Sequence, residues 1–471
     1  MGRIGTAATA ALALLVAACG GDEEAGETGA DEPAEEARPA ATLNDFEGEW
    51  SGTLEVMGQA LPLVLHVDPA APVPVTLDST AQGAFGLEAE AGVEDGQLTA
   101  RWPEIGATYT GALSRDGEAI AGPFVQNGVE LRLRMTRARV AAAPPNLPQA
   151  VVGTPPYEVV TGSAESVPGV RLAYTLTLPG GEGPVPGVVL VTGSGPQDRD
   201  ETIMGHKPFA VLADHLTRAG IAVLRYDDRG VGRSTGTFEG AVSRDFADDA
   251  AAMLGALRRE ADERGMLLSG AGVLGHSEGG IVAGLVAAET EGDPDFLVSL
   301  AGPFVPMADL LGRQTEDALR ARGAADEQVA ASAAVQRRLV EAAMTDGPPE
   351  AACEAVADAA SGLPLGTQEQ AKAFCGTWFR QLLRIDPARL YAGLDVPALA
   401  LFGALDGQVA AEPNAAAAEA AGTVEVRVVP GVNHLFQAAQ TGAVSEYGAI
   451  EETMSPDVLA LIADWIGETA R

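Results

Sequence analysis

The stretch Gly275-His276-Ser277-Glu278-Gly279 decides the fold of this chain. It follows an apolar run over residues 271–274 and precedes an Ala-rich helical pattern over residues 280–288. A serine between glycines at such a junction is typical of a sharp turn from strand to helix, because glycines remove side chains that would clash there. The turn exposes the serine hydroxyl at a sheet edge, so the stretch predicts a nucleophile at Ser277.

A second match to the same pattern occurs at Gly232-Arg233-Ser234-Thr235-Gly236. Ser234 follows a loop sequence, and residues 235–240 after it carry no helical pattern. Ser277 alone has a strand before it and a helix after it. The helix start also directs backbone N–H groups and the positive end of the dipole toward an oxyanion. We therefore assign the nucleophile to Ser277.

A serine hydroxyl needs a base to remove its proton, and histidine is the usual base. In a fold that places the nucleophile on this kind of turn, the chain order is serine, then acid, then histidine. Of the five histidines, only His434 follows Ser277. It lies in a loop just after an apolar strand pattern over residues 424–429, which is where a base facing the turn should stand. His434 is therefore the predicted base.

The acid that orients this histidine should follow the preceding strand, predicted over residues 397–402. Asp406 follows it within the sequence Gly403-Ala404-Leu405-Asp406. Its carboxylate would accept the Nδ1–H of His434 and stabilise the imidazolium. Asp386 and Asp395 are rivals, but both precede the strand. Asp406 is therefore the predicted third member of a catalytic triad.

Two backbone N–H groups are expected to bind the oxyanion of a tetrahedral intermediate. The residue after the nucleophile, Glu278, supplies one. The other should come from the loop after an early strand; residues 192–196, Thr-Gly-Ser-Gly-Pro, follow such a strand and make Ser194 the candidate.

This loop lacks the phosphate-binding G-x-x-x-x-G-K-[ST] pattern, and no Cys/His cluster has metal-ligand spacing. We predict neither a cofactor nor a metal.

From about residue 157 to 471, apolar strand patterns alternate with helical patterns. Such alternation predicts an α/β fold, with a mostly parallel sheet that is covered by helices on both faces. The predicted strands cover residues 187–192, 221–226, 272–275, 296–301, 397–402 and 424–429. A long Ala-rich helical stretch over about 306–385 interrupts the alternation and predicts a cap inserted over the carboxyl edge of the sheet.

Residues 43–140 are predicted to form a β-rich barrel or sandwich domain. Leu61, Leu63 and Leu65 alternate with other residues, and Gly-containing turn signals recur. Trp50 is expected in the core, and His66 is expected to be structural. A Pro-rich linker over residues 141–156 separates this domain from the α/β domain.

The N-terminus predicts export and anchoring. Residues 1–18 combine Arg3 with an uncharged, Ala- and Leu-rich run that is short for a membrane span. The run ends in small residues before Cys19, which resembles the lipobox of bacterial lipoproteins and implies a lipid on Cys19; the alternative is an ordinary signal peptide. Residues 19–42 predict an acidic disordered tether. Together they predict a protein of the cell envelope, anchored to the membrane outside the cytoplasm.

The formal net charge of −36 excludes nucleic acid as a partner, because phosphates would be repelled. Besides Cys19 there are two cysteines, Cys353 and Cys375. In an exported protein they could form a disulfide or remain two buried thiols. The oligomeric state is left open by the sequence.

Five blocks of the chain together resemble the α/β-hydrolase superfamily, in particular bacterial esterases grouped with serine aminopeptidase-like domains. The blocks are residues 193–200 (GSGPQDRD), 225–234 (RYDDRGVGRS), 275–280 (GHSEGG), 403–406 (GALD) and 433–437 (NHLFQ). The resemblance implies the α/β-hydrolase fold, and some of these esterases also carry a β-rich N-terminal domain. Two departures stand out: Thr192 replaces a common histidine, and Glu278 brings a carboxylate that could face the substrate.

These features lead us to expect a serine hydrolase that cleaves small carboxylic esters with short acyl chains through an acyl-enzyme. An aminopeptidase or amidase could use the same triad, with Glu278 binding the amino group of its substrate. A third alternative is an envelope binding protein with an inactive hydrolase domain.

Overall fold

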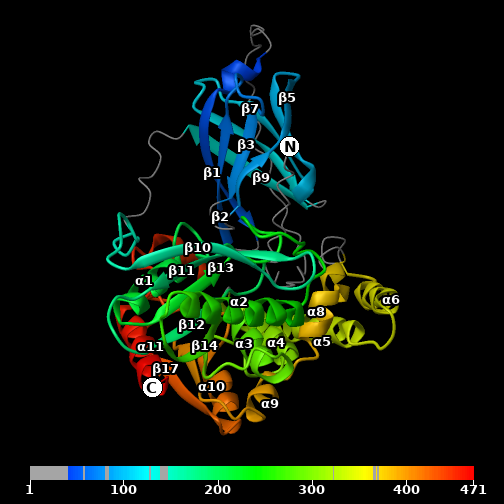
Figure 1. The fold of residues 1–471 in the computed structure, drawn as a ribbon. Helices are drawn as coiled ribbons and strands as arrows, with labels where there is room; N and C mark the ends of the chain where they lie inside the picture. The colour runs from blue at the N-terminus through cyan, green and yellow to red at the C-terminus, as the bar shows by residue number, and fades with distance from the viewer. Residues whose placement is uncertain are drawn as a thin grey trace, which may run out of the picture.

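A computed structural model describes residues 41–56, 59–79, 84–126, 129–137, 147–321, 323–363, 368 and 371–470. Figure 1 shows an all-β domain, in blue to cyan, above a larger domain of helices and strands, in green to red. The predicted signal segment and Cys19 lie outside the described residues, as do all but the last two residues of the predicted tether.

The N-terminal domain is one antiparallel sheet of nine described strands in the order β4-β3-β2-β1-β9-β8-β7-β6-β5. Alternate side chains of these strands share one apolar core, and Trp50 is fully buried in it, as predicted. The strands are β1 (Gly48–Val56), β2 (Gln59–Val67), β3 (Val75–Ser79), β4 (Ala84–Glu88), β5 (Glu90–Glu94), β6 (Gln97–Trp102), β7 (Ala107–Leu113), β8 (Ala119–Gln126) and β9 (Val129–Arg137).

The second domain contains an eight-stranded sheet in the order β10-β11-β13-β12-β14-β15-β16-β17. The pairs β10–β11 and β11–β13 are antiparallel, and every pair from β13 to β17 is parallel. This is the predicted α/β-hydrolase fold. The strands are β10 (Glu158–Glu165), β11 (Arg171–Leu178), β12 (Val185–Val191), β13 (Ala222–Tyr226), β14 (Leu268–His276), β15 (Leu297–Leu300), β16 (Ala398–Gly403) and β17 (Val424–Val429).

Helices cover both faces of this sheet. Along β12, Val189 and Val191 pack on one side with the cluster that includes α2 (Ser243–Glu263) and α3 (Glu278–Glu289). Val188 and Leu190 point to the other side, into the cluster with α1 (Pro208–Arg218) and α11 (Pro456–Thr469). A strand buried on both faces explains why these segments are continuous apolar runs in the sequence.

The parallel strands match the predicted ones within a few residues, but β10 and β11 were missed. Their signal was present in the sequence, because Leu172, Tyr174, Leu176 and Leu178 alternate along β11. The two strands extend the sheet at its antiparallel edge, away from the parallel strands that carry the predicted site residues.

Between β15 and β16 the chain forms a helical insertion, seen in yellow-green to orange at one side of Figure 1. A disulfide joins Cys353 of α6 to Cys375 of η4, which settles the alternative between a bond and two thiols. The described helices between β15 and β16 are α4 (Met307–Ala321), α5 (Asp326–Ala343), α6 (Pro349–Ala360), the short η4 (Lys372–Cys375), α8 (Thr377–Leu382) and α9 (Pro387–Ala392). None of the helices in the described part of the chain has the length and apolar character needed to cross a membrane.

Candidate active site

Ser277 lies in the sharp turn between β14 and α3, as the flanking pattern predicted. Its backbone has φ 53° and ψ −119°, a conformation that residues with a side chain rarely adopt. The Ser277 N–H donates to the carbonyl of Leu300 on the neighbouring strand at 2.8 Å, which helps to hold the turn. Ser277 is only partly buried.

The glycines on either side of Ser277 are required by close contacts. A Cβ added to Gly275 would lie 1.8 Å from the carbonyl oxygen of Gly279. One added to Gly279 would lie 2.4 Å from the carbonyl oxygen of Val191 on β12. Strand, turn and helix therefore approach one another more closely than any side chain would allow.

His434 and Asp406 are joined by a hydrogen bond of 2.7 Å between Nδ1 and Oδ2. Both side chains are buried. The other oxygen of Asp406, Oδ1, accepts the backbone N–H groups of Gln408 and Val409 at 2.7 and 2.8 Å. These two donors fix the orientation of the carboxylate, and Oδ2 is left to accept the Nδ1–H of His434. The neutral imidazole then carries its basic lone pair on Nε2.

The loop that carries His434 is shaped by its neighbour Asn433, whose side-chain oxygen accepts the N–H groups of Leu435 and Gln437. A Cβ on Gly403, at the end of β16, would lie 2.6 Å from the Asn433 carbonyl. The glycine thus lets the loop before Asp406 pack directly against this loop.

Two of the rejected candidates, Asp386 and Ser234, make structural hydrogen bonds, and the third, Asp395, is exposed. Asp386 accepts the N–H of Arg389 and caps α9 (Pro387–Ala392), while Asp395 is exposed before β16. The hydroxyl of Ser234 donates to the carbonyl of Asp227 at 2.7 Å and accepts the N–H of Ala173 at 2.9 Å. Ser234 therefore holds a loop.

His434 contacts His276, the residue that precedes Ser277 in the sequence. The rings of His276 and His434 have centroids 4.8 Å apart, and Nε2–H of His276 donates to the carbonyl of His434 at 3.0 Å. Within the described residues, the Ser277 hydroxyl has no hydrogen-bond partner. In structures without substrate, catalytic hydrogen bonds are often long and tighten when substrate binds.

The predicted oxyanion donors, Ser194 and Glu278, lie on the loop after β12 and at the start of α3. Neither backbone N–H has an intramolecular acceptor in the described part of the chain. The Gly193 N–H, by contrast, is occupied, because it donates to Oε1 of Glu201 at 2.9 Å. Ser194 follows Gly193 in this loop, and its backbone N–H remains free to donate.

The carboxylate of Glu278 is occupied by donors within the protein. It is buried and accepts three hydrogen bonds, from the hydroxyl of Ser194 at 2.8 Å, the hydroxyl of Ser243 at 2.7 Å and Nε1–H of Trp378 at 2.9 Å. Burial raises the pKa of Glu278, and the three donors oppose the rise only in part. The carboxylate ties the loop after β12 to α2 and to α8 of the insertion.

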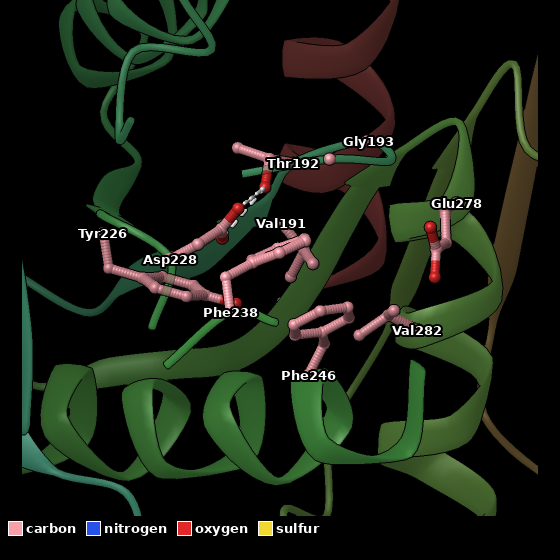
Figure 2. A pocket seen from close by; sticks show the side chains of 10 residues that line it. Val191, Thr192, Gly193, Tyr226, Asp228, Phe238, Phe246, Glu278 and Val282 are labelled. Atoms are coloured by element: carbon pink, nitrogen blue, oxygen red, sulfur yellow. Dashed lines mark hydrogen bonds between the residues drawn. The ribbon is translucent and has the colours of Figure 1, made fainter. Parts of the chain in front are cut away.

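Thr192, the other departure from the family pattern, anchors the same loop. Its hydroxyl donates to the carboxyl group of Asp228 at 3.1 Å. Figure 2 shows this pair above the stacked rings of Phe238 and Phe246. The cavity among these side chains is small: the space open to the centre of a water molecule is about 10 Å³. It has room for a single water but not for a substrate.

The sequence did not identify Glu201, Ser243 or Trp378 as parts of this region. Glu201 directly follows the GSGPQDRD block, and this position is the one signal in the sequence; the burial of its carboxylate is seen only in the structure. Ser243 and Trp378 lie 35 and 100 residues from Glu278 along the chain, with no motif around them.

Comparison with known proteins relates this domain to hydrolases. The family model described as Hydrolase_4, serine aminopeptidase, S33, matches residues 206–438. The esterase EstD of Thermotoga maritima is 30% identical over 236 residues, which are 50% of this chain and 50% of that protein. The chain thus spans about half the length of this curated relative. The C-terminal domain, which has the α/β-hydrolase fold, is thus similar to the S33 family model and to an esterase.

Solved structures with similarity to the chain have low sequence identity. The esterase Pf2001 of Pyrococcus furiosus is 16% identical with a TM-score of 0.41, over 69% of this chain and 96% of that one. The proline iminopeptidase of Mycobacterium smegmatis is 15% identical with a TM-score of 0.42, over 66% and 99%.

Proposed function

We propose that the chain is a serine hydrolase that cleaves carboxylic esters, with Ser277 as nucleophile, His434 as base and Asp406 as the orienting acid. The observation that carries the proposal is the buried hydrogen bond of 2.7 Å between His434 and Asp406, together with the contact of His434 with His276, which directly precedes a serine held at φ 53°. Acyl transfer requires a histidine whose tautomer is fixed and a nucleophilic serine, and these residues are the candidates for both roles.

In the proposed reaction, Nε2 of His434 removes the proton from Oγ of Ser277 as Oγ attacks the ester carbonyl. The backbone N–H groups of Ser194 and Glu278 bind the oxygen that becomes negative. The imidazolium then gives its proton to the departing alcohol, which leaves the acyl group on Ser277. Water, deprotonated by the same base, attacks the acyl-enzyme, and the acid departs from Ser277.

The ester assignment is supported over the amide alternative by two features. The curated relative is an esterase, and the carboxylate that could bind a substrate amine, Glu278, is already occupied by three donors. We therefore expect esters of short acyl chains to be hydrolysed faster than aminoacyl anilides. Faster anilide turnover would contradict the ester assignment and favour an aminopeptidase.

The test compares purified wild type with Ser277→Ala and, as a matched control, Ser234→Ala in the second pentapeptide. We expect wild type and Ser234→Ala to hydrolyse p-nitrophenyl acetate and to react with a fluorophosphonate at Ser277. Ser277→Ala should lose both reactions. Undiminished hydrolysis by Ser277→Ala would refute the assignment, and a wild type that neither hydrolyses esters nor takes the label would favour an inactive binding protein.

We also propose that Cys19 is lipidated and anchors the protein to the cell envelope, from the small residues before it and the acidic stretch after it. Radioactive palmitate should label wild type expressed in a bacterium but not Cys19→Ser. The label should co-sediment with membranes. Equal labelling of both proteins would contradict the anchor.

A further inference from the structure

His276, the second residue of the pentapeptide, makes contacts that the proposed reaction does not use. Its Nδ1 lies 2.8 Å from Oε1 of Glu201, and its Nε2 lies 3.0 Å from the carbonyl oxygen of His434. Both partners are acceptors, so each ring nitrogen must carry a hydrogen to satisfy them. His276 is therefore placed as an imidazolium, paired with a carboxylate.

The charge state agrees with this geometry. Burial disfavours the charged ring, but the carboxylate of Glu201 and the hydrogen bonds to Glu201 and His434 outweigh it, so the pKa of His276 is raised. The negative charge of Asp406 acts in the same direction. Glu201 itself is buried, with a left-handed backbone at φ 52°.

Glu201 also reaches the loop of the predicted oxyanion donors. Its Oε1 accepts the N–H of Gly193 at 2.9 Å as well as the Nδ1–H of His276. One carboxylate oxygen thus holds the residue before Ser194, and one imidazole holds both that carboxylate and the backbone of His434. The chain of contacts runs from the loop after β12, across the turn of Ser277, to the loop after β17.

We propose that Glu201 and His276 act as a positioning pair, which sets the distance between the oxyanion loop and the His434 loop around Ser277. The inference rests on the proposed function. A misplacement of about 1 Å between reacting groups is enough to slow catalysis by about 100-fold. A pair that bridges both loops at the turn controls that distance without contacting the substrate.

Stabilisation of the fold alone explains the pair less well. A buried ion pair is generally no more stabilising than apolar residues of the same volume, because both charges lose their hydration. The same domain offers a control: Asp249 is also buried and accepts Nε–H of Arg229 at 2.7 Å, but it contacts neither loop. Asp249→Asn removes a comparable charge from the core.

The experiment measures kcat and KM for p-nitrophenyl acetate in wild type, Glu201→Gln, His276→Gln, the double variant and Asp249→Asn, well below each unfolding midpoint. We expect each single variant of the pair to lower kcat by about 10- to 100-fold, with KM changed less than about twofold. The double variant should lose no more than the worse single variant, because the two residues act as one unit. Asp249→Asn should keep the wild-type kcat.

A kcat of Glu201→Gln within about twofold of wild type would overturn the proposal, as would losses that multiply in the double variant. Equal inactivity of wild type and Ser277→Ala would instead refute the hydrolase function.

In that case the unfolding midpoints of the variants test the ion pair between Glu201 and His276. The stabilisation by this ion pair is fully present below the pKa that His276 has in the unfolded chain. It is lost as pH rises through the higher pKa of His276 in the folded protein. The unfolding midpoint of Glu201→Gln should lie further below that of wild type at pH 6 than at pH 9. An equal difference at both pH values would also overturn the proposal.

Discussion

Replacing Glu278 with alanine removes the acceptor of three hydrogen bonds at once. The donors are the hydroxyls of Ser194 and Ser243 and the indole N–H of Trp378, at 2.7–2.9 Å. Each buried donor left without an acceptor costs about 1–3 kcal/mol. Ser194 is exposed and can turn to water, which leaves two costly donors and the lost packing. We expect Glu278→Ala to lower the free energy of unfolding by about 3 kcal/mol, a large share of the 5–15 kcal/mol typical of a domain.

Glutamine at the same position should be far milder, for a geometric reason. Ser243 and Trp378 both donate to Oε1, which the amide oxygen of glutamine replaces. The amide nitrogen then takes the place of Oε2, and the hydroxyl of Ser194 can rotate to accept from it. All three contacts survive in Glu278→Gln, so we expect a change below about 1 kcal/mol at neutral pH.

The difference between glutamate and glutamine should depend on pH. Because burial raises the pKa of Glu278 in the folded state, the folded protein binds this proton more tightly than the unfolded chain does. Stability therefore falls as pH rises from the unfolded pKa toward the raised one. Glutamine does not titrate. We expect Glu278→Gln to gain stability relative to wild type as pH rises above about 4.5.

The assay is urea unfolding of wild type, Glu278→Ala and Glu278→Gln at several pH values. Glu289→Gln is the matched control, because Glu289 lies on the same helix but is partly exposed and paired with Arg244. That change should cost less than about 1 kcal/mol. The reasoning is refuted if glutamine destabilises the protein as much as alanine does, or if alanine behaves like the control.

Three further predictions concern the reaction and the turn. Asp406→Asn should lower kcat by about 10³- to 10⁴-fold with little loss of stability, because the two N–H groups that hold Oδ1 leave the amide NH₂ facing His434 and impose the wrong tautomer; a kcat near wild type would contradict this. Gly275→Ala should abolish activity and lower the melting temperature, whereas Gly255→Ala inside α2, where a Cβ meets nothing closer than 3.4 Å, should raise stability by about 0.5–1 kcal/mol. Burial holds the pKa of Asp228 well above its usual range, so the stability of Asp228→Asn relative to wild type should be greater at pH 8 than at pH 4. A change in melting temperature that is the same at both pH values would argue against a buried acid there.

The parts of the fold that the sequence predicted correctly are those with local signals. Parallel strands buried on both faces are continuous apolar runs, and the turn at Ser277 has glycines that close contacts require. His434 and Asp406 were found by chain order and by their place after a strand. Their hydrogen bond follows from this topology, since the carboxyl ends of neighbouring parallel strands lie at one edge of the sheet.

Contacts between distant segments could not be predicted in the same way. Trp378 meets Glu278 because the insertion folds back on α3, and no periodicity in the sequence encodes that approach. Glu201 lies in a loop, where an acidic residue is ordinarily solvated. Its role depends on the fold bringing His276 to it from 75 residues away.

These contacts change the interpretation of the two residues that flank Ser277. The carboxylate of Glu278 was expected as a group that could face the substrate, whereas the imidazole of His276 had no predicted role. In the structure both side chains are held by other parts of the protein: His276 holds Glu201 and the His434 backbone, and Glu278 holds Ser194 and Trp378. Because successive side chains at a sharp turn point in different directions, one pentapeptide can tie its strand, its helix and three other segments together. Selectivity for the substrate must then come from side chains outside the pentapeptide, and substitutions at these two positions should change kcat before they change the choice of ester.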